Sequence, residues 1–327
     1  MRFAVLGAGA IGAYVGAALA RGGSDVTLVA RGEHLRALQR NGVRVLSARG
    51  DFEANPRATD DVDAIGEADV VFIGLKAHQL PPLAPKIGRA LKPGAAVIAG
   101  QNGVPWWYFQ SYDGPLQGTV LESVDPGGAI ARAIPAEAVV GCVLYCATEI
   151  VEPGVIRHIE GTRFTIGEPD GVKSKRCAAI AEAFVGGGLK CPVETRIRDQ
   201  IWLKLIGNVA FNPVSTLTGA TLGELGTQPE MVALLRAILE ECAAVAQRLG
   251  AELPVSLERR LQAGLAVGDH KTSMLQDLEA GKPLELDCLT GAVIELAAKL
   301  DVPVPHTAAV DACARLLGEL RHAARAA

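Results

Sequence analysis

The sequence predicts an α/β N-terminal domain built on a mainly parallel sheet, followed by an all-α C-terminal domain. Short apolar runs alternate with helical stretches up to about residue 168, and a glycine-rich turn follows the first of these runs. From about residue 197 the apolar period becomes helical. A chain of 327 residues is long enough for about two domains. We place them at residues 1–196 and 197–327.

Composition excludes several classes of protein. Hydrophobic residues make up 49% of the chain, which is too many for a disordered protein. A net charge of −4 provides no basic surface for nucleic acid. We find no signal peptide and no apolar run of 18 residues, so we expect a cytoplasmic protein without a membrane span. The seven cysteines include no Cys-x-x-Cys pair, which indicates reduced thiols and no metal site.

The first expected elements form one strand–helix–strand unit. Residues 2–6 are a short apolar run typical of a central parallel strand. A Gly-x-Gly-x-x-Gly string follows at residues 7–12 and leads into an Ala-rich helix that ends near Gly22-Gly23. Residues 26–29 form the next strand. The unit spans about 30 residues, as in Rossmann-type domains that bind dinucleotides.

Each glycine of this turn has a physical role in such a unit. Gly7 permits the tight turn, Gly9 lets backbone N–H groups approach a pyrophosphate, and Gly12 allows close packing of helix on strand. The helix N-terminus adds positive potential for the phosphates. The alternative is a glycine-rich turn without a ligand. The predicted cofactor-binding residues of the turn are Gly7, Gly9, Ala10, Ile11 and Gly12.

The end of the second strand predicts which dinucleotide is bound. Enzymes selective for NAD usually carry Asp or Glu there, bonded to the ribose 2′-hydroxyl. This chain has Ala30-Arg31, and an arginine can pair with a 2′-phosphate through two hydrogen bonds. We therefore predict NADP(H). The nearby Glu33 complicates this prediction, and a solvated Arg31 is the alternative.

Two later strands end in polar residues. The strand at residues 68–75 ends at Lys76, and the strand at 95–99 leads into a glycine-flanked turn with Asn102. Ligands bind outside the carboxyl ends of parallel strands. We therefore expect Lys76 near the cofactor phosphate or ribose, and Asn102 near nicotinamide and substrate. The alternatives are a surface lysine and an asparagine that caps its own turn.

Residues 139–146 and 163–166 are β-like, with a Pro153-Gly154 turn between them. We expect them to be antiparallel strands that extend the sheet.

The first helix of the C-terminal half carries an unusual polar stripe. Lys204, Asn208 and Asn212 are spaced four residues apart, among apolar neighbours. Three such residues either satisfy one another or face a polar ligand. A lysine in apolar surroundings also has a lowered pKa, which suits a proton donor near neutral pH. We expect Pro213 to kink or end this helix.

Two further polar positions lie beyond the next helix, which is expected at about residues 230–249. Thr272 or Ser273 has the pattern of a helix N-cap. After Gly281, helical structure is expected to resume at Pro283, with Glu285 as a first-turn acid. On these residues alone, structural roles are the simpler interpretation of both Ser273 and Glu285.

Taken together, these segments resemble the ketopantoate reductase (2-dehydropantoate 2-reductase) family, whose members use NADPH. The resemblance spans nearly the whole chain in the family's order. It implies a C-terminal domain like that of 6-phosphogluconate dehydrogenase, and it is compatible with a homodimer. The matching segments are residues 7–12, Gln101-Asn102-Gly103, Trp202-Leu203-Lys204 with Asn208 and Asn212, and residues 272–277 followed by Glu285.

The resemblance also implies roles for individual residues. Lys204 matches the general acid that protonates the developing alkoxide, and Glu285 matches the acid that orients this lysine and the substrate. Arg31 and Lys76 match residues that recognise the NADP phosphate. The positions that match substrate ligands are Asn102, Asn208, Asn212 and Ser273, of which Ser273 matches the ligand of the carboxylate. The implied substrate is a 2-keto acid, most directly ketopantoate.

One segment departs from the family. After Asn102 the chain carries an aromatic run, Trp106-Trp107-Tyr108-Phe109, which is either core packing or a changed wall of the substrate pocket. Extra residues near 124–128 also suggest insertions. A reductase of another 2-keto acid or bulkier ketone is therefore an alternative, and a noncatalytic NADP-sensing protein is a minor one. The six histidines form no evident His–acid pair for a histidine-based dehydrogenase.

Overall fold

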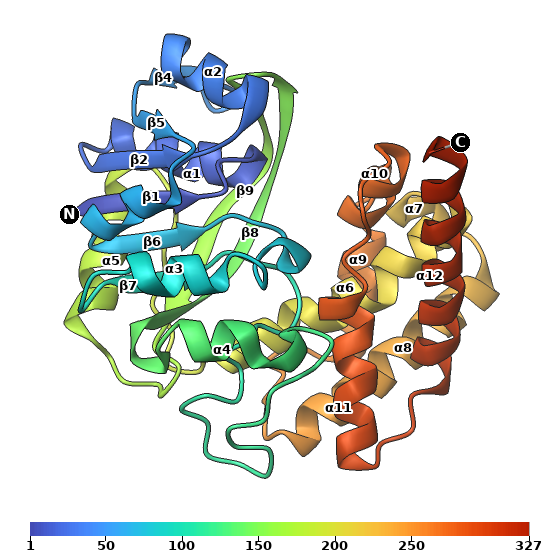
Figure 1. Cartoon of the computed structure of the whole chain (residues 1–327). Coiled ribbons are helices and arrows are strands. Elements are labelled where there is room, and N and C mark those ends of the chain that lie inside the picture. The colour runs from blue at the N-terminus through green and yellow to red at the C-terminus, as the bar shows by residue number, and fades with distance from the viewer. Residues whose placement is uncertain (327) are drawn as a thin grey trace.

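The computed structural model describes residues 1–326 and divides into a sheet-containing half and a helical half (Figure 1). One nine-stranded sheet has the order β4-β3-β9-β8-β7-β6-β1-β2-β5. Its strands are β1 (Arg2–Leu6), β2 (Asp25–Val29), β3 (Val43–Ser47), β4 (Phe52–Ala54), β5 (Arg57–Thr59), β6 (Val70–Ile73), β7 (Ala96–Ala99), β8 (Val139–Glu152) and β9 (Val155–Gly167). The helices of this half are α1 (Ala10–Arg21), α2 (Gly32–Asn41), α3 (Ala84–Ala90), α4 (Ala129–Ala133) and α5 (Lys175–Gly186).

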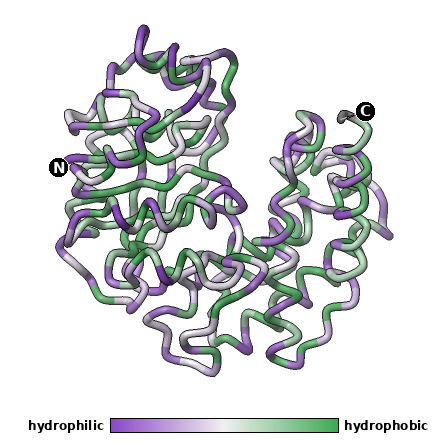
Figure 2. The backbone as a smooth tube through the Cα atoms, in the orientation of Figure 1, coloured by the Kyte–Doolittle hydropathy of each residue, from purple (hydrophilic) through white to green (hydrophobic). Residues whose placement is uncertain are grey.

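The central strands are parallel and buried. β5, β2, β1, β6, β7 and β8 run in one direction, and every residue of β6 and β7 is buried. Figure 2 shows the middle of the sheet as hydrophobic, as expected for strands covered on both faces. β8 and β9 form the predicted antiparallel pair, and β8 joins β7 in parallel.

The helical half begins with the long helix α6 (Ile197–Thr218), which contacts β8 on one side and α8 and α12 on the other. The remaining helices are α7 (Leu222–Leu225), α8 (Pro229–Arg248), α9 (Leu257–Leu265), α10 (Ser273–Glu279), α11 (Ala292–Leu300) and α12 (Pro305–Ala326), with a π-helical turn at Asp287–Gly291. The predicted fold class is confirmed. The domain boundary at residues 196 and 197 stays a prediction, and residue 327 lies outside the described part of the chain.

Helix α6 does not end at Pro213, where we expected it to kink or stop. It continues to Thr218, although Pro213 cannot donate a hydrogen bond to the preceding turn. Phe211 and Val214 on either side are buried in the helical core. Tertiary packing of this apolar face therefore outweighs the local cost of the proline.

The aromatic run is part of the core. Trp106, Trp107 and Tyr108 are buried, and the indole N–H of Trp202 on α6 donates to the Tyr108 hydroxyl at 2.8 Å. The Arg198 guanidinium lies 5.7 Å from the Trp107 ring and donates to the Tyr108 carbonyl. The core-packing interpretation is therefore confirmed, since these side chains fasten the loop after β7 onto the first helix of the other half.

Three further observations concern the part of the chain that the structure describes. Within it, no helix combines the length and the apolar character needed to cross a membrane. No group of three or more His, Cys, Asp and Glu side chains is placed to hold a metal ion. The seven cysteines are free thiols.

Candidate active site

The glycine turn between β1 and α1 is shaped by backbone contacts. Gly7 has φ +90°, and a Cβ there would lie 2.9 Å from the Leu75 backbone nitrogen. A Cβ at Gly12 would overlap the carbonyl oxygen of Gly7, whereas a Cβ at Gly9 would meet no atom within 4 Å. Sequence reasoning missed Gly74, where a Cβ would lie 2.7 Å from that same carbonyl. The turn thus has no room for side chains beneath it and open space above Gly9.

The N-terminus of α1 faces this open space without a side-chain cap. Gly9 is the N-cap residue, and Ala10 and Ile11 in the first turn are half-buried. The first N–H groups of a helix have no partner within the helix and favour negative charge. The described residues therefore fit the pyrophosphate of a dinucleotide, which would accept hydrogen bonds from these N–H groups.

Arg31 lies at the carboxyl end of β2, where the predicted 2′-phosphate would be read. It is the N-cap residue of α2 and is exposed. Among residues 1–326, no hydrogen bond or ion pair engages its side chain. Glu33 instead forms an exposed ion pair with Arg36 at 3.8 Å. The guanidinium of Arg31 is thus available to an anionic ligand, and Glu33 does not compete for it.

Lys76 is engaged in a contact that the sequence did not indicate. Its ammonium forms an ion pair with Asp277 on α10 at 2.5 Å, and the two side chains are 30% and 15% exposed. The pair joins the end of β6 to the helical half. A role for Lys76 at the cofactor phosphate stays a prediction, and it would require the ammonium to exchange Asp277 for the nucleotide or to serve both.

Lys204 is the centre of a polar cluster assembled from three segments. Its Nζ donates to Asn102 Oδ1 in the turn after β7 and to the Leu144 carbonyl on β8, each at 2.7 Å. The Tyr145 ring centroid lies 5.7 Å from the same ammonium. The sequence indicated Lys204 and Asn102 separately, but it could not reveal the main-chain acceptor of Leu144.

The surroundings of Lys204 tune its charge. Burial lowers the pKa of Lys204 to about 8, and nearby Cys142 and Glu285 act in the opposite direction. Burial also raises the pKa of Cys142 to about 12, so this thiol stays protonated near neutral pH. Lys204 can therefore exchange a proton close to physiological pH, which an exposed lysine with a pKa near 10.4 does poorly.

A small pocket opens at this lysine. Asn208 is half-buried in its wall, whereas Asn212, one turn further along α6, is only 7% exposed. Within the described residues, neither amide bonds to Lys204, so the three polar residues of the stripe do not satisfy one another. The pocket is lined by Gln101, Asn102, Gly103, Pro105, Cys142, Val143, Ile201, Lys204, Leu205 and Asn208.

The predicted N-cap at Thr272 or Ser273 is confirmed at Thr272, whereas Glu285 is not in the first turn of a helix. Thr272 is the N-cap of α10 and accepts from the Leu275 N–H at 3.3 Å, so the exposed Ser273 hydroxyl remains available to a ligand. Glu285 precedes the π-helical turn at Asp287–Gly291 and lies outside any helix. The interpretation of Glu285 as a first-turn acid is therefore wrong.

The segment that follows Glu285 is docked against the turn that carries Asn102. The Val104 N–H donates to the Cys288 carbonyl at 2.8 Å, and a Cβ at Gly103 would lie 2.7 Å from the Cys288 carbonyl carbon. This close approach requires a glycine. It explains how Glu285, distant in sequence, comes near enough to Lys204 to influence its pKa.

One His–acid pair does exist, contrary to the sequence-based expectation. His306 Nδ1 lies 2.7 Å from Glu241 Oε1, and the same carboxylate accepts from the backbone N–H groups of His306 and Thr307. These contacts cap the N-terminus of α12. The pair therefore has a structural role and gives no support to a histidine-based dehydrogenase mechanism.

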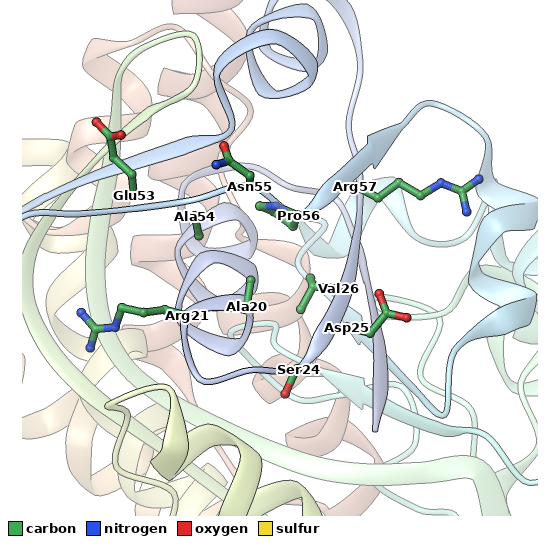
Figure 3. A pocket seen from close by; sticks show the side chains of 10 residues that line it. All are labelled: Ala20, Arg21, Ser24, Asp25, Val26, Glu53, Ala54, Asn55, Pro56 and Arg57. Atoms are coloured by element: carbon green, nitrogen blue, oxygen red, sulfur yellow. The ribbon is translucent and has the colours of Figure 1, made fainter.

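A larger cavity of about 410 Å³ lies beside α1 and β2, and it contains none of the predicted site residues (Figure 3). The guanidinium groups of Arg21 and Arg57 point in opposite directions in this view. Arg21 packs over the Phe52 ring at 4.3 Å. Because its charged groups do not converge, we assign no ligand to this cavity.

The uncapped glycine turn and the lysine of lowered pKa define the class of protein: an oxidoreductase that works with a bound dinucleotide. The family models described as "Ketopantoate reductase PanE/ApbA" and "Ketopantoate reductase PanE/ApbA C terminal" match residues 3–171 and 196–317. The chain belongs to the ketopantoate reductase family.

Individual relatives are similar over almost their whole length. The 2-dehydropantoate 2-reductase of Mesorhizobium japonicum is 46% identical, with 97% of this chain and 98% of that protein covered. The 2-dehydropantoate 2-reductase of Halobacterium salinarum is 31% identical over 93% and 95%. A Ralstonia solanacearum crystal structure assigned to the ketopantoate reductases is 41% identical, with a TM-score of 0.92 and 98% of each chain covered.

Proposed function

We propose that this protein reduces a 2-keto acid with NADPH, most directly ketopantoate to pantoate, with Lys204 as the general acid. The observation that carries the proposal is the Lys204 ammonium held between Asn102 and the Leu144 carbonyl, with burial lowering its pKa to about 8. The relatives named 2-dehydropantoate 2-reductase support this choice of substrate.

Lys204 acts on the substrate oxygen. A reduced nicotinamide, when bound, supplies a hydride to the carbonyl carbon of the keto acid. The Lys204 ammonium donates a hydrogen bond to the carbonyl oxygen and neutralises the negative charge that develops there. Nζ then transfers its proton to the alkoxide. Stabilising charge that appears only as the reaction proceeds lowers the barrier more than it tightens substrate binding.

The neighbouring polar groups position the lysine and the substrate relative to each other. Asn102 accepts from Lys204 through Oδ1, which leaves its NH₂ group free to donate to the substrate. Asn208 and Asn212 follow at helical spacing, and the Ser273 hydroxyl is not used as a cap. Glu285 places negative charge near Lys204 and helps to keep it protonated.

We further propose which half of the chain does what. Residues 1–196 hold the dinucleotide at the glycine turn, with Arg31 pairing with the 2′-phosphate of NADP(H). Residues 197–327 supply the general acid and most substrate ligands. A homodimer formed through the helical half is compatible with this division, and its mass in solution measured by light scattering would test it.

The direct test measures NADPH oxidation with ketopantoate beside a panel of other 2-keto acids, and repeats each assay with NADH. We expect ketopantoate to give the highest kcat/KM, and NADPH to be preferred over NADH. A higher kcat/KM for a bulkier keto acid would favour the related reductase activity instead. Tight NADPH binding without turnover of any keto acid would contradict the proposal and favour an NADP-sensing role.

A further inference from the structure

Arg260 on α9 lies against the helix that carries Lys204. Its Nε donates to the Leu203 carbonyl at 3.3 Å. The guanidinium covers Gly207 so closely that a Cβ at this position would overlap it. Gly207 is thus a glycine in the interior of a long helix, where glycine is unfavourable, and its evident use is to let Arg260 approach.

Within the described part of the chain, this guanidinium has no anionic partner. Arg260 is half-buried, and burial lowers its pKa while Tyr145 acts in the opposite direction. Among residues 1–326, no carboxylate forms an ion pair with it. A partly buried charge without a counter-charge is costly, and a bound anion would offset that cost.

Arg260 lies against the segment of α6 that carries the reactive lysine. Leu203 and Gly207, which it contacts, are the direct neighbours of Lys204 and Asn208 along α6. Tyr145 connects the two cations, because its ring lies 5.7 Å from the Lys204 ammonium and its pKa is influenced by Arg260. Helix α6 thus carries one cation for a carbonyl oxygen, and α9 places a second cation against the same segment of α6.

A second cation would complement the charge of the substrate. A 2-keto acid carries a carboxylate next to the reacting carbonyl. The other proposed substrate ligands are uncharged amides and a hydroxyl, Glu285 is acidic, and Lys204 is committed to the carbonyl oxygen. A guanidinium matches a carboxylate through two parallel hydrogen bonds, which fixes orientation as well as charge.

We propose that Arg260 binds the carboxylate of the 2-keto acid and orients its carbonyl toward Lys204. This inference rests on the proposed function, because it concerns the same substrate at the same site. Ser273 then adds one neutral donor, and Arg260 supplies the charge. Selection for an acid over the corresponding neutral ketone follows from this arginine.

The test compares Arg260→Gln and Arg260→Lys with a matched control, Arg259→Gln. Arg259 is the preceding residue of α9 and is exposed. For each variant, KM and kcat are measured with ketopantoate, Ki with pantoate, and Kd with NADPH alone. Thermal unfolding of each variant reports on the fold.

We expect Arg260→Gln to raise KM for ketopantoate and Ki for pantoate about 10- to 100-fold, as for the loss of a charge-assisted hydrogen-bond pair. The Kd for NADPH stays within twofold, because the dinucleotide turn is untouched. Arg260→Lys recovers part of the affinity through its single point charge. Arg259→Gln behaves as wild type.

A purely structural role for Arg260 would give a different pattern. Arg260→Gln would then lower the unfolding temperature and kcat while KM and Ki stayed at their wild-type values, and that outcome overturns the inference. If wild type turns over no 2-keto acid, the proposed function fails and the inference fails with it. If wild type is active and Arg260→Gln matches it in KM and Ki, only the role of Arg260 is refuted.

Discussion

The glycine turn at residues 7–12 and the cluster around Lys204 are built in opposite ways. The turn uses consecutive backbone groups, and its fit depends on absent side chains at Gly7 and Gly12. The cluster uses side chains and a carbonyl that lie 102 and 60 residues from Lys204 in sequence. A site made of backbone recognises a ligand common to many proteins, whereas a site made of assembled side chains can set the pKa of one group.

Replacing the lysine breaks the side-chain site and leaves the backbone site intact. We expect Lys204→Met to lower kcat about 10²- to 10⁴-fold, the usual contribution of a general acid. Its Kd for NADPH, followed by nucleotide fluorescence, should equal that of wild type. Lys173→Met, at an exposed lysine, is the control. Turnover above a tenth of wild type would remove Lys204 from the mechanism.

A methyl group breaks the backbone site. Gly12→Ala forces a Cβ into the carbonyl of Gly7, and we expect the free energy of unfolding to fall by about 1–3 kcal/mol, as for an overpacked core. Gly9→Ala has free space and should unfold like wild type, yet bind NADPH more weakly because its methyl group faces the pyrophosphate. Denaturant titration and nucleotide binding measure the two effects. Equal stability of both variants with wild type would contradict the packing argument.

Arg31 is the side chain that we propose adds to the backbone site, so its replacement tests whether that site depends on backbone alone. Arg31→Ala should lower kcat/KM with NADPH about 10- to 100-fold, because a charge-assisted pair with the 2′-phosphate is lost. For the same variant, kcat/KM with NADH should change less than threefold. The control variant Arg36→Ala should leave kcat/KM unchanged with both nucleotides. An equal loss with both nucleotides would mean that Arg31 does not read the 2′-phosphate.

The smallest effect concerns tuning within the lysine cluster. With a pKa of about 8, Lys204 is a protonated acid below pH 8, so kcat for reduction should fall as pH rises through that value. Asn102→Ala removes an acceptor that favours the charged form, and the midpoint should move to lower pH by about half a unit. Profiles of kcat against pH measure this shift. A move to higher pH would show that Asn102 does not stabilise the ammonium.

The two regions also differ in how far the sequence predicted them. The turn is a local pattern whose strand and helix are adjacent, so its elements could be placed from the residues alone. The stripe of Lys204 was visible as helical spacing, but the Leu144 acceptor and the Lys76–Asp277 ion pair depend on how distant segments meet. The expected helix end at Pro213 is wrong because the local cost of the proline is smaller than the packing gained by continuing α6, and the expected kink stays a prediction.

Local rules failed most clearly at Glu285, whereas the predicted N-cap at Thr272 or Ser273 is confirmed at Thr272. The local pattern placed Glu285 in the first turn of a helix, but the helical turn begins only at Asp287; for Ser273 and Glu285 alike, the local pattern gave no sign of a ligand. Only the family resemblance indicated roles in the site. Neither the local patterns nor the family resemblance indicated Arg260, because a single arginine on a charged helix has no distinctive sequence pattern. Its contact with Gly207 is visible only in the structure.

The crowding of Gly7, Gly12 and Gly74 limits how this protein can diversify. At each of these three positions a side chain would collide with neighbouring backbone atoms. We therefore do not expect substitutions at these glycines to change the nucleotide preference without disturbing the fold. The Arg31 side chain is exposed and forms no hydrogen bond or ion pair within residues 1–326, so we expect substitutions there to leave the fold unchanged. If Arg31 reads the 2′-phosphate as proposed, the nucleotide preference can change by single substitutions after β2 while the glycine turn stays the same.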